Sequence, residues 1–425
     1  MTDRVTQQKG ASTSTPSAFV RYLTSKIVTK IASDAAVQKA RKKAEARRQK
    51  QGRRHVVEYF HQADDGYSQI AVQMLPRLAE RYDVNIICHL VTASLGNNAP
   101  EPELLAAYAH RDAAKIAPYY GLEAPKACPP EALTDLQNLY GGAGQGALSD
   151  RLEAGNRRRQ ELGHYSGAMF FYEGEWYGGV DRLYHLEKRL ASLGADTRPW
   201  TPLVAPRPLV EIGRVRDQGR LTLEFYPSLR SPYTAIVFDR VVRLAEDTGV
   251  KLVVKPVLPM VMRGVPVTRV KGIYIFKDAA REARDAGVAY GNFYDPIGDP
   301  VIACYSLYPW AVEQGKGNAL ISAFLKAAFV LGINTNRRCG MKKVVDMAGL
   351  EWAEACVRMG RDDNWQDMLE ENRRTLYQAG LWGVPSFRLL DEKGAPVLAL
   401  WGQDRLWLVA REIKRLITDG SLISE

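Results

Sequence analysis

The feature that most constrains the fold is a pattern that occurs twice along the chain. Glu58-Tyr59-Phe60 leads to Asp65-Gly66-Tyr67, and Glu224-Phe225-Tyr226 leads to Ser231-Pro232-Tyr233-Thr234. In both places an alternating, β-rich stretch is followed by a polar residue at which a helix can begin. The chain is therefore predicted to be a tandem duplication.

The two halves also close alike. Gly179-Val180-Asp181-Arg182-Leu183 in the first half corresponds to Gly402-Gln403-Asp404-Arg405-Leu406 in the second. The opening motifs are 166 residues apart and the closing motifs 223 residues apart, so the second copy carries 57 additional residues between its ends. The second copy also keeps polar chemistry that the first has lost, which directs the search for function to it.

Both copies have the predicted order strand, helix, strand, helical insertion, hairpin, helix. In the first copy, hydrophobic periodicity places these elements over residues 55–60, 68–81, 84–91, 100–162, 168–177 and 181–193. In the second copy they are placed over residues 221–226, 233–247, 251–258, 271–379, 384–400 and 404–417. This is the order of a thioredoxin fold with an inserted helical subdomain. The predicted fold class is therefore α/β, with two tandem thioredoxin-like domains.

The domain limits follow from changes in composition. Residues 1–55 form a basic arm, predicted to be disordered up to residue 16 and helical after it. Residues 56–195 are the first thioredoxin-like domain, and residues 221–417 are the second. Residues 196–220 are rich in proline and lack periodicity, so they are predicted to be a linker.

The net charge of +10 is concentrated in the basic arm. Residues 1–55 hold 14 Lys and Arg against 3 Asp and Glu, whereas the rest of the chain holds 44 against 45. The domains are thus nearly neutral, and any anionic partner is expected on the arm. The apolar positions of the arm, Phe19, Leu23, Ile27 and Ile31, recur at helical spacing, which predicts an amphipathic helix followed by a charged extension.

Several interpretations of residues 17–54 stay open at this stage. The helix can be a solvated element that docks on a domain, a segment that binds an anionic membrane surface, or a segment that binds RNA. Its acid-poor, Arg- and Ser-rich composition also resembles an organelle transit peptide. The sequence does not decide among them.

The cysteines give no metal or redox signature. Cys88, Cys128, Cys304, Cys339 and Cys356 include no Cys-x-x-Cys pair and no matching histidine spacing, so no metal site is expected. Cys339 follows a cation, which favours a thiolate, but an ordinary packed cysteine is the commoner case. Sparse cysteines, the lack of a secretory signal and the lack of a long apolar run lead us to expect a cytoplasmic protein.

The motif Ser231-Pro232-Tyr233-Thr234 occupies the position at which redox thioredoxins carry Cys-x-x-Cys. There a strand ends and a helix begins, and unpaired amides with the helix dipole favour a thiolate. Serine and threonine cannot exchange disulfides, so what remains is an anion site with a hydroxyl donor, suited to a thiolate from another molecule. The simpler interpretation is that Ser231 caps the helix and Pro232 occupies its first position.

Two further loops of the second copy are predicted to meet this motif. Pro385, in Gly383-Val384-Pro385-Ser386-Phe387, precedes the hairpin, where a cis-proline would leave the Val384 backbone free to pair with a peptide-like ligand. Gln403 and Asp404 open the last helix and offer an amide and a carboxylate. The simpler interpretations are a turn proline and a helix cap.

These motifs together resemble a known family. Residues 221–416 look like the glutathione-dependent 2-hydroxychromene-2-carboxylate isomerases and the kappa-class glutathione transferases of the DsbA-like thioredoxin superfamily. The resemblance is carried by Ser231-Pro232-Tyr233, by Lys271, Tyr274, Asp278 and Arg281, by Gly332 to Asn334, by Ala348-Gly349-Leu350, by Gly383 to Phe387 and by Trp401 to Leu406.

The resemblance implies that glutathione is the cofactor and that a small molecule is the substrate. Ser231, beside Pro232 and Tyr233, would bind the thiol, and Val384 beside cis-Pro385 would pair with the cysteinyl backbone. Gln403 and Asp404 would hold the glutamyl end of glutathione. Lys271 would help to bind an anionic substrate, although an exposed helix lysine is the simpler interpretation. The family isomerases use the thiolate as a transient nucleophile on a conjugated aromatic acid.

The first copy resembles the same superfamily, but its site is predicted to be dismantled. Asp65 replaces the serine, and Ala168 stands where the cis-proline is expected. A carboxylate at this position repels a thiolate but suits a helix cap. The loop of His61, Asp64 and Asp65 is better explained as solvated than as a metal site.

Three functions therefore remain open from the sequence. The first is a glutathione-dependent isomerase or transferase acting on a conjugated aromatic small molecule, with its chemistry in the second copy. The second is a non-enzymatic thioredoxin-like scaffold that the basic arm recruits to a membrane or to RNA. The third is a DsbA-family disulfide oxidoreductase, which the lack of Cys-x-x-Cys disfavours.

Overall fold

The computed structural model describes residues 16–126, 130–265, 267–361 and 364–421. The predicted disordered stretch lies outside them except for Pro16, and so does Cys128. The chain divides into two compact units. The N-terminal unit consists of Asp34–Pro208 and Thr268–Tyr274, and the C-terminal unit of the described parts of Met1–Ser33, Leu209–Val267 and Ile275–Glu425.

The N-terminal unit contains the first predicted copy. Its elements are α2 (Asp34–Lys50), β1 (Val56–Gln62), α3 (Gly66–Ala71), η1 (Val72–Met74), α4 (Leu75–Arg81), β2 (Asn85–Val91), η2 (Gly96–Asn98), α5 (Pro102–Ile116), η3 (Ala117–Tyr120), α6 (Pro130–Tyr140), α7 (Leu148–Glu161), β3 (Met169–Tyr172), β4 (Glu175–Gly178), η4 (Val180–Arg182) and α8 (Leu183–Ser192). Its sheet has the order β2-β1-β3-β4, in which β1 and β2 are parallel and the other pairs are antiparallel.

The C-terminal unit contains the second copy. Its elements are α1 (Ala18–Ala32), β5 (Thr222–Tyr226), α9 (Pro232–Thr248), β6 (Lys251–Val254), η5 (Met260–Arg263), α10 (Arg269–Asp285), α11 (Asp299–Glu313), α12 (Gly317–Phe329), α13 (Arg338–Met347), α14 (Trp352–Arg358), α15 (Asn364–Gln378), β7 (Ser386–Leu390), β8 (Pro396–Trp401), η6 (Gln403–Arg405) and α16 (Leu406–Ser421). The first residues of α10 belong to the N-terminal unit.

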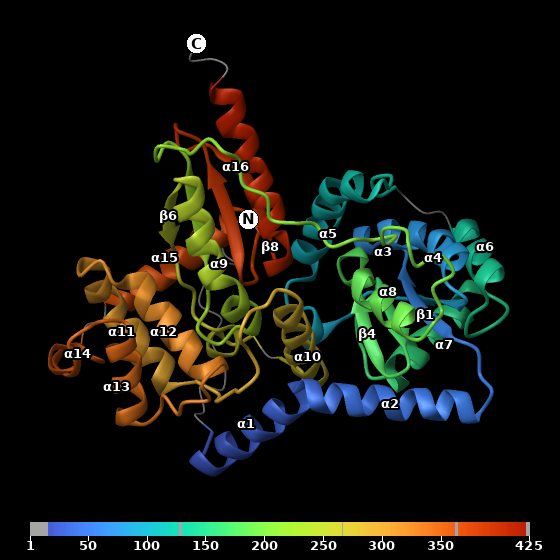
Figure 1. Ribbon diagram of the computed structural model, residues 1–425, viewed down its shortest axis with the longest axis horizontal. Coiled ribbons are helices and arrows are strands. Elements are labelled where there is room, and N and C mark those ends of the chain that lie inside the picture. Colours follow the sequence, from blue (N-terminus) through green and yellow to red (C-terminus); the bar gives the residue numbers. More distant parts are fainter. Residues whose placement is uncertain (1–15, 127–129, 266, 362–363, 422–425) are drawn as a thin grey trace. The chain divides into compact units, whose positions relative to one another are not determined.

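The two sheets share one topology. The C-terminal sheet has the order β6-β5-β7-β8, with β5 and β6 parallel and the other pairs antiparallel, which matches β2-β1-β3-β4 strand for strand. Figure 1 shows α9 and α16 beside the C-terminal sheet, and α11 to α14 gathered as an inserted helical subdomain. The predicted pair of tandem thioredoxin-like domains with helical insertions is confirmed.

A buried aromatic cluster fixes α9 on the C-terminal sheet. Phe225 of β5 lies opposite Phe387 of β7, with ring centroids 5.3 Å apart and planes inclined by 10°. Phe238 of α9 packs on Phe225 with centroids 5.7 Å apart, and all three side chains are buried. Burying each such ring contributes about 1.5–3 kcal/mol. This packing holds the N-terminus of α9 at the end of β5.

Prolines account for two differences from the predicted elements. The helix predicted over residues 68–81 is divided into α3, η1 and α4, because Pro76 lies at the start of α4 and has no N–H to donate to the preceding turn. The strand predicted over residues 251–258 ends at Val254. Lys255 still donates to Phe225 O (2.7 Å), but Pro256 cannot extend the ladder.

The segments predicted as arm and linker are divided between the units. The arm forms α1, which belongs to the C-terminal unit, and α2, which belongs to the N-terminal unit. Residues 196–220 contain no helix or strand. Thr197 donates to Arg81 O (3.0 Å) and Asp217 donates to Thr248 O (2.7 Å), so each end of this segment is tied to its own unit.

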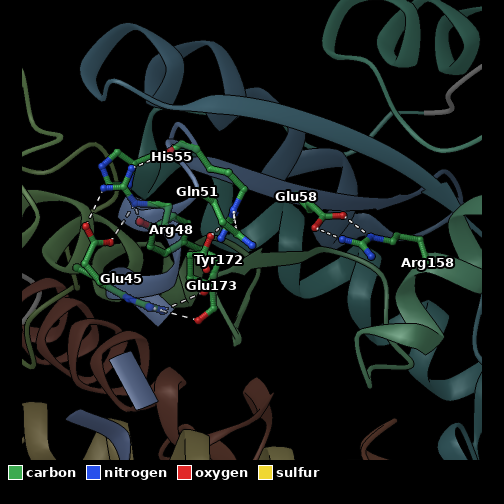
Figure 2. A network of polar contacts seen from close by, with 10 residues as sticks. Glu45, Arg48, Gln51, His55, Glu58, Arg158, Tyr172 and Glu173 are labelled. Atoms are coloured by element: carbon green, nitrogen blue, oxygen red, sulfur yellow. Dashed lines mark hydrogen bonds and ion pairs between the residues drawn. The ribbon is translucent and has the colours of Figure 1, made fainter. Parts of the chain in front are cut away.

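Basic side chains of α2 and of the segment that follows it form ion pairs inside the N-terminal unit, and Figure 2 shows the pair of Arg48 with Glu45. Arg48 forms an ion pair with Glu45 (2.7 Å) and donates to Arg53 O (2.7 Å). Arg53 in turn pairs with Glu173 in the turn between β3 and β4 (2.7 Å). Part of the arm's positive charge therefore serves to fix α2 and the turn after it.

A second ion cluster lies on β1. The Glu58 carboxylate accepts hydrogen bonds from Arg158 Nε and Nη2 at 2.8 and 2.7 Å (Figure 2). It also lies 2.8 Å from His89 Nε2. Burial alone would raise the pKa of Glu58, but the hydrogen bonds from His89 and Arg158 outweigh it and lower the pKa to about 2. Glu224, at the matching position of β5, pairs with Lys255 (2.6 Å) and Arg388 (3.0 Å).

The lowered pKa of Glu58 predicts a pH dependence of stability. Because the folded pKa lies below the unfolded one, the stabilisation is complete above the unfolded pKa and is lost as pH falls toward about 2. It amounts to about 3 kcal/mol. Urea unfolding of the wild type and of Glu58→Gln should differ most near neutral pH and converge in acid. A difference that stays constant with pH would contradict this assignment.

Candidate functional site

The N-terminus of α9 presents a capping serine. Ser231 Oγ accepts a hydrogen bond from Thr234 N (3.2 Å), and Pro232 takes the first helical position, where a missing N–H costs nothing. Ser231 is half-buried. The positive end of the α9 helix dipole favours negative charge here.

The serine hydroxyl faces the proline loop of the second copy. Ser231 Oγ donates to Val384 O over 3.5 Å, and the Val384–Pro385 peptide bond is cis, as predicted. Within the described part of the chain, Val384 N–H has no backbone hydrogen-bond partner. The backbone beside the serine thus has a donor available to a ligand.

The third loop joins the first two. Gly402 N donates to Pro385 O (2.9 Å), and Gly402 has a φ of 113°, which favours glycine. This bond brings Gln403 and Asp404 to the proline loop. Asp404 has a carboxylate that is partly exposed and lies 3.8 Å from Arg405 Nη1. The structure therefore brings together Ser231, Val384, Pro385 and the opening of the last helix.

Gln403 is held from behind by α10. Its Nε2 donates to Glu282 Oε2 (2.8 Å), whereas its Oε1 is buried without a hydrogen-bond partner. A buried acceptor without a partner costs about 1–3 kcal/mol, so a ligand that donates to it would relieve this cost. Sequence reasoning missed Glu282. The signal was available, because this acidic residue shares a helix face with Asp278 and alanines.

Tyr233 points to a buried carboxylate. Its hydroxyl donates to Asp278 Oδ2 (2.8 Å), and Asp278 also pairs with Arg281 (2.5 Å). Asp278 is 2% exposed. Tyr233 therefore fixes the first turn of α9 to α10 through a charged hydrogen bond.

An ion pair precedes the serine, and it was also missed from the sequence. Arg230 Nε and Nη2 contact the two carboxylate oxygens of Asp295 at 2.8 and 2.9 Å. Burial alone would raise the pKa of Asp295, but the Arg230 guanidinium outweighs it and lowers the pKa. Sixty-five residues separate the partners, and the sequence carries no local sign of this pair.

Lys271 belongs to the N-terminal unit rather than to the group around Ser231. Its Nζ donates to Asn98 O (3.0 Å) and lies 5.9 Å from the centre of the Tyr165 ring. Burial lowers the pKa of this amine. Its predicted contact with a substrate stays a prediction.

The first copy has the same loops with different chemistry. Asp65 caps α3 by accepting from Ser68 N (2.9 Å) and Ser68 Oγ (2.8 Å), and burial raises its pKa. Ala168 takes the place of the cis-proline with a φ of 51°, and Gly179 N donates to its carbonyl (2.7 Å). The carboxylate thus occupies the position that Ser231 occupies in the second copy.

The cysteines and possible metal ligands add no second site. Cys88 and Cys304 are free and buried, and burial raises the pKa of both thiols. Cys339 is free and exposed. Across residues 16–126, 130–265, 267–361 and 364–421, no three His, Cys, Asp or Glu side chains form a group that could hold a metal ion. None of the helices in these ranges has the length and apolar character needed to span a bilayer.

The fold and these loops define a thioredoxin-like protein in which a hydroxyl takes the place of the redox thiol. Residues 222–414 match the family model of the DSBA-like thioredoxin domain. No curated protein matches the chain.

Three solved structures are examples of proteins whose structures are similar to this chain. A 2-hydroxychromene-2-carboxylate isomerase is 17% identical, covers 48% of this chain and all of its own, and has a TM-score of 0.40. A probable DsbA oxidoreductase from Streptomyces coelicolor is 18% identical over 45% of this chain and 89% of its own, with a TM-score of 0.35. The cytosolic disulfide reductase DsbM from Pseudomonas aeruginosa, solved with GSH, is 16% identical over 47% of this chain and 98% of its own, with a TM-score of 0.35.

Proposed function

We propose that the C-terminal unit binds glutathione and acts as an isomerase or transferase on a conjugated, aromatic small molecule. The observation that carries this proposal is the position of the Ser231 hydroxyl, at the N-terminus of α9 and 3.5 Å from the carbonyl that precedes cis-Pro385. A hydroxyl donor and the positive end of a helix dipole at one point favour a thiolate.

The residues of the three loops fit the chemical groups of glutathione. Val384 N–H is available to the cysteinyl carbonyl, and the partnerless Gln403 Oε1 is an acceptor for the glutamyl ammonium. Asp404 adds a partly exposed carboxylate near the same end. The buried Gln403 Oε1 would gain a partner on binding, which supports a peptide-like ligand with a terminal amine.

Glutathione would supply a thiolate nucleophile, and the chain would hold it. Ser231 Oγ–H would turn from Val384 O, where its bond is long, toward the sulfur, and Thr234 N would continue to donate to Ser231 Oγ. The last histidine of the chain is His185, so the second copy has no imidazole base of its own.

A second candidate function is that of a non-enzymatic scaffold. The N-terminal unit favours it, since the buried Asp65 carboxylate stands where a thiolate would have to bind. A disulfide oxidoreductase is disfavoured by Ser231 and Thr234 at the two thiol positions.

Four free cysteines among the described residues agree with a reducing compartment, and we place the proposed enzyme in the cytoplasm.

Calorimetric titration of reduced glutathione into the full chain tests the proposal. Ser231→Ala is expected to weaken binding roughly 10- to 100-fold and to raise the pKa of the bound thiol, because one charge-assisted hydrogen bond of about 1.5–3 kcal/mol is lost. Asp404→Ala should weaken binding as well.

Asp181 provides the matched control, because it opens the last helix of the first copy as Asp404 opens that of the second. Asp181→Ala should leave glutathione binding unchanged. Equal losses in the two aspartate variants would argue against a site in the C-terminal unit. No binding at millimolar glutathione would reject the enzyme and favour the scaffold.

A further inference from the structure

Helix α1 buries its polar face. Arg21 and Ser25 are 1% exposed, and Thr29, one turn further, is half-buried. These side chains recur at i+4 spacing and therefore share one side of the helix. Amphipathic helices on the surface of a domain ordinarily bury the apolar side instead.

The buried polar face binds the backbone of the segment between α10 and α11. Arg21 Nη2 donates to Ile297 O (2.8 Å), and Ser25 Oγ accepts from Asp295 N (3.0 Å). Thr29 Oγ1 accepts from Phe293 N (2.9 Å). This irregular segment would otherwise leave buried peptide groups without partners, so the polar face of α1 is fixed in place.

The apolar face of α1 consequently points away from the C-terminal unit. Phe19, Leu23 and Ile27 are 72%, 47% and 48% exposed. Val20 and Tyr22 are 50% exposed beside them. Three of the four apolar positions that the sequence spacing identified, Phe19, Leu23 and Ile27, thus form an exposed apolar surface, whereas Ile31 is half-buried. Such a surface is a candidate binding face.

The charge of this face is uniformly positive. Lys26 and Lys30 are exposed on the same side of α1, and Lys26 Nζ lies 5.7 Å from the centre of the Tyr22 ring. No acidic residue occurs in α1. The face therefore combines aromatic and aliphatic side chains with ammonium groups, a composition complementary to anionic headgroups over an apolar layer.

We propose that the outer face of α1 docks the protein on an anionic lipid bilayer surface. Phe19, Leu23 and Ile27 would enter the interfacial layer, while Lys26 and Lys30 would meet lipid phosphates. RNA fits less well, because aliphatic side chains neither pair with phosphates nor stack on bases. An anionic bilayer surface can contact both the apolar side chains and the lysines of this face.

Vesicle co-sedimentation with the full chain tests this proposal. Wild-type protein should bind vesicles of equal phosphatidylcholine and phosphatidylglycerol, and should bind pure phosphatidylcholine vesicles much less. Phe19→Ser/Leu23→Ser/Ile27→Ser and Lys26→Glu/Lys30→Glu should each lower binding about tenfold or more. Far-UV circular dichroism checks that both variants fold.

The matched control removes exposed apolar side chains elsewhere. Leu139→Ser/Val357→Ser changes residues that are 76% and 62% exposed outside α1, and should bind vesicles like the wild type. Equal binding to both vesicle types would overturn the proposal. The absence of vesicle binding would overturn it too. In that case, a dimer that dissociates in the apolar variant would indicate that the face binds a second copy, and RNA affinity lost in the lysine variant would indicate that it binds single-stranded RNA.

Discussion

Replacing Asp278 with alanine is expected to lower the free energy of unfolding by about 3–5 kcal/mol, the usual cost of removing one partner of a buried ion pair. The carboxylate is 2% exposed, accepts from Tyr233 and neutralises Arg281. Its loss leaves a largely buried guanidinium without this counter-ion. The start of α9 also loses its charged hydrogen bond to α10. Urea denaturation of the full chain measures the change.

A double variant separates the two consequences. Asp278→Ala/Arg281→Met removes both charges and should recover most of the lost stability, because no uncompensated charge remains. Glutathione binding should be weakened in Asp278→Ala and equally in the double variant, since in both Tyr233 loses its hydrogen bond to Asp278. Asp112→Ala breaks the equivalent bond to Tyr67 (2.7 Å) in the first copy and should leave glutathione binding intact. Full recovery of binding in the double variant would exclude this positioning role of Asp278.

The fold was predictable because its signals are local. Strand β1 and strand β5 each carry an alternating motif, and the residue after each predicted loop, Asp65 or Ser231, caps a helix. These patterns repeat in the same order, so one recognised copy supported the other. The sheet order follows from the parallel crossover and the terminal hairpin that the predicted order contains.

The candidate site was predictable where a short motif encodes it. Ser231-Pro232 predicts the start of a helix, and Pro385 before a hairpin predicts a cis-proline. The supporting contacts join residues far apart in the sequence, such as Gln403 and Glu282, which are 121 residues apart. No periodicity or turn signal reports such pairs.

Helix α1 shows a different limit of sequence reasoning. Its apolar spacing correctly predicted an amphipathic helix, but spacing does not say which face is buried. The orientation is set by peptide groups of residues 293–297. The carbonyl of Ile297 accepts a hydrogen bond from Arg21, and the N–H of Asp295 donates one to Ser25. A buried polar network can thus override the apolar stripe.

Comparison of the two copies separates structural residues from functional ones. Tyr67 with Asp112 and Tyr233 with Asp278 form the same hydrogen bond, in both cases 45 residues apart. This shared contact fixes the start of the helix in each copy, and in the second copy it also positions the turn that follows Ser231. The copies differ at the capping residue and at the proline position, where Ala168 replaces the cis-proline. The proposed chemistry depends on these two differences.

Asp295 links the fold of the C-terminal unit to the proposed site. Its carboxylate binds Arg230, which directly precedes Ser231, while its backbone N–H donates to Ser25 of α1. Asp295→Asn keeps the size of the side chain but removes the charge that neutralises Arg230. We expect the free energy of unfolding to fall by about 3–5 kcal/mol. Glutathione binding should weaken too, because the residue before Ser231 is no longer held.

The backbone contacts of Asp295 give this prediction its control. Ser25→Ala removes the acceptor of Asp295 N–H on α1 but leaves the pair with Arg230, so it should cost about 1–3 kcal/mol and spare glutathione binding. Arg230→Gln/Asp295→Asn removes both charges and should be more stable than Asp295→Asn alone. Chemical denaturation and titration of the same samples provide both readouts. If Asp295→Asn unfolds like the wild type, the ion pair does not hold the loop before Ser231, and the serine must be positioned by its cap alone.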